Sequence, residues 1–191
     1  MNLTRTFLDQ KFVLNETILL EKKYFHHEIN VLRKKSGDLF IVFDGKGQSA
    51  LAEIISTKKN FEILIKKIFP PSPRSGIDFD LGQALIKSDP FNIALQKATE
   101  LGVKTFSPIL TERVVINRKS LNSKNRIEKW YQTARGACEQ CGENWVPFIN
   151  EPTNLKEWAR ETSSMTKILL YPNAETKLSD IAFEETVSIA I

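Results

Sequence analysis

Two cysteines, Cys138 and Cys141, form a CEQC motif near the end of an expected helix. This spacing could serve a redox pair or half of a zinc site. Redox chemistry is disfavoured because the dipole at a helix C-terminus raises the pKa of a thiol. Zinc is disfavoured because the other soft ligands, His26 and His27, are adjacent and project about 100° apart on a helix. We interpret the pair as one core and one surface cysteine and expect no metal site.

The two histidines follow two aromatic residues within an expected helix over residues 21–33. They could simply pack this helix against a small domain. Alternatively, one ring faces RNA, because imidazole rings stack on unpaired bases while nearby arginines and lysines hold phosphates. Both alternatives stay open, and the candidate RNA-binding residues are Arg5, His26, His27, Arg33 and Lys34.

Charged and amide side chains also recur where expected elements end. Glu112 and Arg113 follow a strand at its carboxyl end, which is where parallel sheets bind ligands. Glu139 and Gln140 interrupt a helix that otherwise runs apolar to its end. These four residues are candidates for a site, although no motif for a nucleotide-binding loop or a serine nucleophile accompanies them.

The segment 96–108 positions much of this chemistry. A helix capped by Asp89 carries an apolar stripe and stops at Gly102, where a left-handed conformation is expected. The stripe consists of Phe91, Ala94, Leu95, Ala98 and Leu101. Strands are expected over 79–86 and 104–110, on either side of the helix. Strand, helix and strand make a crossover unit whose two strands are parallel. On the exposed side of this helix, Lys97 and Glu100 are spaced as a surface ion pair. Such a pair stabilises a protein by about 0.2–0.5 kcal/mol.

The organisation of the chain changes at residues 69–76, a proline-rich connector. Several short strands before it predict a small β-barrel, in which residues 44–47 (DGKG) form a hairpin turn rather than a phosphate cradle. Alternating strands and helices after it predict an open parallel sheet. The expected fold class is α/β, with a barrel over 1–71 and a second domain over 72–191. The chain ends within an expected apolar strand, 187–191, so we expect a truncated product.

Composition narrows the class of function. The 191 residues are 41% hydrophobic and 26% charged, as in ordinary globular proteins, and no run is long enough to span a membrane. The N-terminus lacks a signal peptide, so a cytoplasmic location is expected. Residues 1–75 hold 13 lysines and arginines against 8 acidic residues, and 113–135 hold seven against one. Basic clusters of this kind favour a polyanionic partner, RNA first.

Four segments, taken together, resemble one known family. Residues 25–38 (FHHEINVLRKKSGD), 86–115 (IKSDPFNIALQKATELGVKTFSPILTERVV), 134–149 (ARGACEQCGENWVPFI) and 168–175 (ILLYPNAE) occur in the family's order. They resemble the RsmE-type methyltransferases, which modify a uridine of 16S ribosomal RNA at N3. The combination of KATELGV, TER and EQxG is the most specific part of this resemblance.

The resemblance implies a PUA-like barrel for RNA binding, joined to a SPOUT methyltransferase domain with a carboxyl-terminal knot. It also implies a cytoplasmic homodimer acting on 16S ribosomal RNA or the small subunit, with S-adenosyl-L-methionine as cofactor. The cofactor-binding residues it implies are Tyr171, Pro172 and Asn173, with Glu112 and Arg113 near the active site and the general base unassigned. Because the chain stops before the family's GPEGG-type loop, we expect it to lack the knot-forming segment and a complete cofactor site. The alternative hypothesis is a non-catalytic RNA-binding module.

Overall fold

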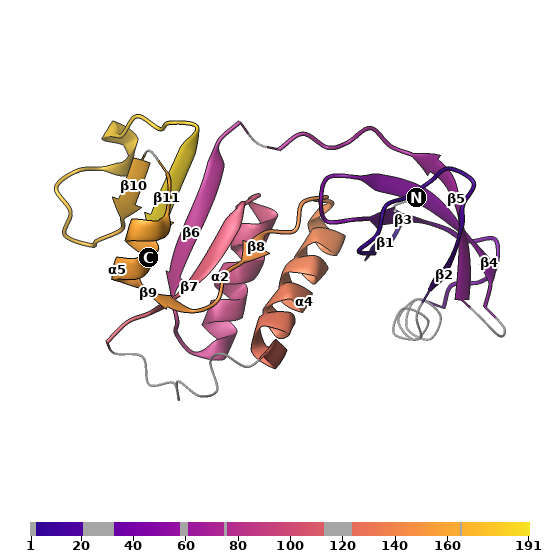
Figure 1. Cartoon of the computed structure of the whole chain (residues 1–191), viewed down its shortest axis with the longest axis horizontal. Helices are drawn as coiled ribbons and strands as arrows, with labels where there is room; N and C mark the ends of the chain where they lie inside the picture. Colours follow the sequence, from indigo (N-terminus) through magenta and orange to yellow (C-terminus); the bar gives the residue numbers. More distant parts are fainter. Residues whose placement is uncertain (1–2, 21–32, 58–60, 75, 113–123, 165) are drawn as a thin grey trace. The chain divides into compact units, whose positions relative to one another are not determined.

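In the computed structural model, the described residues are 3–20, 33–57, 61–74, 76–112, 124–164 and 166–191. The chain forms two compact units, Met1–Pro73 and Arg74–Ile191 (Figure 1). The helix expected over 21–33 lies outside the described residues, apart from Arg33. Within the described ranges, no helix combines the length and the apolar character needed to cross a bilayer.

The first unit is built on a five-stranded sheet with the order β1-β3-β4-β5-β2. Its strands are β1 (Arg5–Phe7), β2 (Thr17–Leu20), β3 (Leu39–Phe43), β4 (Ser49–Ser56) and β5 (Phe61–Ile68). β1 pairs with β3 in parallel, and the other neighbours are antiparallel. Among the described residues the sheet stays open between β1 and β2. The unit is therefore a half-barrel, more open than the small β-barrel that the sequence predicts.

Strict alternation along the strands produces the core of this half-barrel. In β5, Phe61, Ile63 and Ile65 are buried while the residues between them are partly exposed. The turn between β3 and β4 is a hairpin, as predicted. The Asp44 carboxylate accepts hydrogen bonds from the backbone N–H groups of Lys46 and Gln48, at 2.7 and 3.0 Å. This pairing uses the loop's amides internally, which explains why it makes no phosphate cradle.

In its described residues, the second unit holds a six-stranded sheet and three α-helices. Its elements are β6 (Asp78–Ala84), α2 (Ser88–Glu100), β7 (Thr105–Leu110), α4 (Lys124–Cys141), β8 (Phe148–Ile149), β9 (Thr153–Asn154), α5 (Leu155–Glu161), β10 (Thr166–Leu169), the 3-10 helix η2 (Leu178–Asp180) and β11 (Thr186–Ala190). The strand order is β10-β11-β6-β7-β8, and β9 pairs with the far end of β7. All pairings between these described strands are parallel, which confirms the expected open α/β sheet.

Helices cover both faces of this sheet (Figure 1). On one face, α2 and α4 bury Phe91 and Trp130 against Phe106 of β7. On the other face, Trp158 of α5 packs with residues of β7 and β11. This layered arrangement follows from strands whose alternate residues are apolar on both sides.

Two expectations for α2 were wrong. The helix begins at Ser88 after Lys87, and no side chain caps it, so Asp89 lies inside the first turn and is not the cap. Leu101 does not join the apolar stripe, because the helix ends at Glu100 and Leu101 is 84% exposed. Gly102 does adopt the expected left-handed conformation, with φ at 81°.

Candidate functional site

The ends of four parallel strands define one edge of the second unit's sheet, here called the carboxyl edge. Backbone hydrogen bonds continue the ladder to this edge: Leu170 N–H donates to Ala190 O, and Leu85 N–H donates to Ile109 O, both at 2.9 Å. The segments that leave β10, β6 and β7 therefore emerge side by side in the order of the sheet. In open parallel sheets this is where ligands bind.

The structure places two groups of expected site residues at this edge. Tyr171, Pro172 and Asn173 follow β10 and are exposed, and Glu112 follows β7 and is also exposed. β10 and β7 are separated by β11 and β6, so about three strand spacings of roughly 4.8 Å lie between the two groups. They share an edge without touching. Arg113 lies outside the described residues.

Three large apolar or aromatic side chains at the carboxyl edge are exposed. Ile86 after β6, Leu170 after β10 and the neighbouring Tyr171 are 44%, 43% and 62% exposed. Exposed apolar side chains are suited to contact with a ligand or partner. The edge therefore combines an apolar surface with an exposed carboxylate at Glu112.

Other chemically interesting residues lie at the opposite edge, where the strands begin. Both α2 and α4 run back from the carboxyl edge, so Glu100, Glu139 and Gln140 fall near their C-terminal ends. Phe148 N–H donates to Lys104 O just before β7 begins, which fixes the segment after α4 at this edge. The sequence motif containing Glu139 and Gln140 is thus separated from Glu112 by the length of the sheet.

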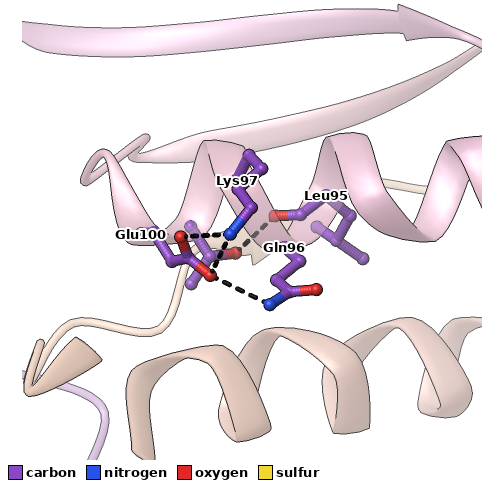
Figure 2. A network of polar contacts seen from close by, with 5 residues as sticks. Leu95, Gln96, Lys97 and Glu100 are labelled. Atoms are coloured by element: carbon purple, nitrogen blue, oxygen red, sulfur yellow. Dashed lines mark hydrogen bonds and ion pairs between the residues drawn. The ribbon is translucent and has the colours of Figure 1, made fainter. Parts of the chain in front are cut away.

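At the end of α2, two side chains converge on one carboxylate (Figure 2). Lys97 Nζ lies 2.8 and 3.0 Å from the two oxygens of Glu100, and Gln96 Nε2 donates to Glu100 Oε1 at 2.9 Å. These contacts lower the pKa of Glu100, with the hydrogen bond from Lys97 as the largest cause and that from Gln96 next. The expected ion pair is present, and it stabilises the last turn of the helix.

We predict that Lys97→Ala raises the pKa of Glu100 toward its ordinary value, because the largest cause of the lowering is removed. A lowered folded pKa stabilises the protein above the unfolded pKa and is lost as pH falls through the folded pKa. Stability of the variant should therefore fall less on acidification. NMR titration of the Glu100 side chain measures the shift, and Lys87→Ala, at the other end of α2, is the matched control. An unchanged Glu100 titration in Lys97→Ala would contradict the assignment.

The cysteine pair divides as the sequence predicts. Cys138 is buried and its thiol lies 3.5 Å from the backbone oxygen of Trp145, whereas Cys141 is exposed. Both are free thiols. Cys138 belongs to the packing between α4 and the segment that follows it.

In the first unit, the proposed RNA-binding residues have different environments. Arg5 is half-buried, with its guanidinium 5.0 Å from the centre of the Phe43 ring, and Arg33 is exposed with φ at 53°. Lys34 is only 9% exposed, and its ammonium lies 4.0 Å from the centre of the Phe40 ring. Arg33 therefore offers the most accessible cation of the three, and Lys34 offers little surface to a phosphate. His26 and His27 lie outside the described residues.

A buried hydroxyl cluster, not anticipated from the sequence, joins α5 to β11. Ser188 Oγ lies 2.5 Å from Thr162 Oγ1 and 2.6 Å from Ser164 Oγ, and Ser188 is fully buried. Three hydroxyls can satisfy one another inside a core, since each both donates and accepts. The cluster holds the end of α5 against the strand that leads to the carboxyl edge. A serine within the apolar run VSIAI is the signal that could have suggested it.

A half-barrel followed by a parallel sheet with helices on both faces is the architecture of a PUA-like unit joined to a SPOUT methyltransferase domain. Residues 73–191 match the family described as RNA methyltransferase domain, and residues 20–66 match RNA methyltransferase PUA domain. The chain belongs to the RsmE family of RNA methyltransferases.

Relatives of known name agree with this assignment. Ribosomal RNA small subunit methyltransferase E of Buchnera aphidicola is 29% identical over 87% of this chain and 66% of its own length. The protein of the same name from Bacillus subtilis is 27% identical over 85% of this chain and 64% of its length. The chain thus spans slightly less than two thirds of the length of these two relatives.

Two solved structures share the fold across nearly the whole chain. A methyltransferase from Legionella pneumophila, in complex with the bound cofactor SAM, is 26% identical with a TM-score of 0.92. The match covers 100% of this chain and 80% of that one. A ribosomal RNA small subunit methyltransferase E from Neisseria gonorrhoeae, bound to S-adenosyl methionine, is 26% identical with a TM-score of 0.89, over 99% and 80% of the two chains.

Proposed function

We propose that this protein transfers a methyl group from S-adenosyl-L-methionine to N3 of a uridine in 16S ribosomal RNA. The observation that carries the proposal is the match of residues 73–191 to the RNA methyltransferase domain, over the unit that holds the parallel sheet. Support for the cofactor comes from the two solved relatives that bind it. Support for the RNA comes from the relatives named as small subunit methyltransferases.

The cofactor is assigned to the carboxyl edge. Tyr171, Pro172 and Asn173 would contact it, because they leave β10 at that edge and Tyr171 exposes an aromatic ring beside Leu170. An adenosine moiety suits an apolar, partly aromatic surface with a few polar groups. The family resemblance predicts that further segments, including the knot, complete this site.

When bound, S-adenosylmethionine supplies the methyl group, and the protein's task is to hold the acceptor nitrogen in line with it at about 3 Å. Uridine N3 carries a proton that must leave, and its pairing face must be exposed from any RNA helix. Glu112 follows β7 at the same edge, and Glu112 together with, from the sequence alone, Arg113 are our candidates near the reacting base. The general base stays unassigned.

We assign RNA binding to the half-barrel and its basic residues. Arg5, Arg33 and, from the sequence alone, His26 or His27 would position the RNA, with Lys34 contributing less because it is nearly buried. The family resemblance also implies a homodimer, which we propose for this chain. Sedimentation equilibrium over a range of protein concentrations tests that state.

Methyl transfer is tested by incubating the protein with S-adenosylmethionine labelled in the methyl group and small subunits that lack the modification. The expected product is N3-methyluridine in 16S ribosomal RNA, identified by nucleoside chromatography and mass spectrometry. Binding of the RNA is measured in parallel. Retained RNA binding with no methylated nucleoside would favour the alternative, a non-catalytic RNA-binding module.

For the half-barrel, we predict that Arg33→Ala weakens binding to small subunit RNA and reduces the slope of log affinity against log salt by about 1. The physical reason is the loss of one exposed cation that neutralises a phosphate. The matched control is Lys156→Ala, which removes one exposed charge from α5 in the other unit. Filter binding at several salt concentrations measures both. An unaltered slope in Arg33→Ala would remove Arg33 from the RNA interface.

A further inference from the structure

A cleft opens where the sheet of the second unit is interrupted at its β8–β9 margin. β8 pairs with the start of β7 and β9 pairs with its end, while residues 150–152 leave the sheet between them. The cleft has a volume of about 660 Å³ and lies between α4 and α5. The lining residues used below are Tyr131, Phe148, Asn150, Glu151, Trp158 and Glu161.

Aromatic rings line this cleft from three elements. Phe148 of β8 is 62% exposed, an uncommon state for so large an apolar side chain, and Trp158 of α5 is 7% exposed. Tyr131 of α4 is fixed in place, because its hydroxyl accepts a hydrogen bond from Ile149 N–H at 3.1 Å. The Tyr131 ring already carries one guanidinium, that of Arg135, at 5.5 Å from its centre. Such rings attract cations.

The two charged side chains that line the cleft are both negative. Glu151 and Glu161 line it and are exposed, and neither makes an ion pair with any residue in the described ranges. Among the described lining residues there is no lysine or arginine. Two carboxylates facing one cavity repel a phosphate and attract a cation. The cleft is therefore unsuited to the backbone of a nucleic acid, in contrast to the basic half-barrel.

The polar atoms of the cleft are mostly hydrogen-bond acceptors. Asn150 donates through Nδ2 to Ser107 Oγ at 2.8 Å, and its side-chain oxygen adds an acceptor to the two carboxylates. Thr153 uses its hydroxyl proton on Glu157 Oε2, at 3.0 Å. A guanidinium offers five N–H donors and no acceptor, so it matches this set. A nucleobase offers acceptors as well, which would face carboxylates.

We propose that this cleft binds the side chain of an arginine presented by a basic polypeptide partner. The guanidinium stacks on Phe148 and donates to Glu151, Glu161 and Asn150. Charge, donor pattern and planarity all select arginine over a phosphate or a neutral base. The proposal is independent of methyl transfer, because the cleft lies at the β8–β9 margin and can be tested without S-adenosylmethionine or RNA.

The test uses the whole chain and three blocked peptides, acetyl-Gly-Arg-Gly-amide and its lysine and citrulline counterparts. Citrulline keeps the planar shape of arginine without its charge. NMR titration should show the arginine peptide shifting the Trp158 indole signal and the amides of residues 148–151 and 153, with the citrulline peptide about tenfold weaker. Replacing both carboxylates, in Glu151→Gln/Glu161→Gln, should weaken the arginine peptide by about tenfold. Phe148→Ala should weaken it by about threefold to fivefold.

Glu175→Gln is the matched control, since it removes an exposed carboxylate outside the cleft and should leave the titration unchanged. Thermal unfolding of each variant verifies that the fold is retained. The proposal is overturned if the citrulline peptide binds equally, if no peptide shifts the cleft, or if adenosine or cytidine shifts it and the arginine peptide does not. It is also overturned if Glu151→Gln/Glu161→Gln abolishes self-association, which would make a second copy the occupant.

Discussion

Replacing Phe91 by alanine should destabilise the second unit by about 3–5 kcal/mol. Phe91 is 2% exposed and joins three elements: its ring centre lies 5.6 Å from that of Phe106 in β7 and 5.1 Å from that of Trp130 in α4. Truncation removes both aromatic contacts and leaves a cavity that two helices and a strand cannot all close. Urea unfolding followed by tryptophan fluorescence measures the loss.

Fluorescence is suited to this measurement because Trp130, Trp145 and Trp158 all belong to the second unit. The signal reports that unit alone, even if the two units unfold separately. Ile93→Ala is the matched control: it lies on the same helix, is 57% exposed, and should change stability by less than about 0.5 kcal/mol. A loss of less than about 1 kcal/mol in Phe91→Ala would show that the core collapses around the gap.

Much of the fold could be predicted from local patterns. The helix and strand around Gly102 were correctly placed, because a left-handed glycine ends a helix whatever surrounds it. The parallel crossover β6-α2-β7 followed from element lengths alone. These features depend on residues close together in sequence, so local patterns are enough to predict them.

Other features depend on partners far away in the chain. β9 has only two residues, and its pairing with β7 requires the bend at residues 150–152. The burial of Lys34 depends on the Phe40 ring in a neighbouring strand. The exposure of Leu101 depends on whether the helix ends at Glu100 or one residue later. Periodicity does not contain this information, because it describes faces of an element and not what lies against them.

The candidate site shows the same division. The carboxyl-edge position of Glu112 follows from its place after a strand, as the sequence predicts, whereas Tyr171 is named by the family resemblance alone. Their separation by two strands was not predicted, because strand order is a property of the whole sheet. The placement of Glu139 and Gln140 at the opposite edge likewise required the direction of α4. The roles proposed for these residues stay predictions.

Replacing Gly82 by alanine should destabilise the second unit by about 1–3 kcal/mol. A Cβ at Gly82 would stand 3.0 to 3.1 Å from three ring atoms of Trp158, closer than packed carbon atoms approach. Trp158 is itself 7% exposed and packs on Ile109 and Ala190, so its ring has little room to move. Urea unfolding, followed by the fluorescence of Trp130, Trp145 and Trp158, measures this loss of stability.

A double-mutant cycle tests whether the contact with Trp158 causes this loss of stability. In a Trp158→Phe background the same glycine substitution should cost much less, because the smaller ring leaves space for the added methyl group. Gly136→Ala is the matched control: it adds a Cβ with nothing within 4 Å, in the middle of α4, and should stabilise by about 0.5–1 kcal/mol. Equal costs for Gly82→Ala in both backgrounds would place the strain in β6 itself. Relief of the cost by Trp158→Phe would instead place its cause in the contact between β6 and the Trp158 ring of α5.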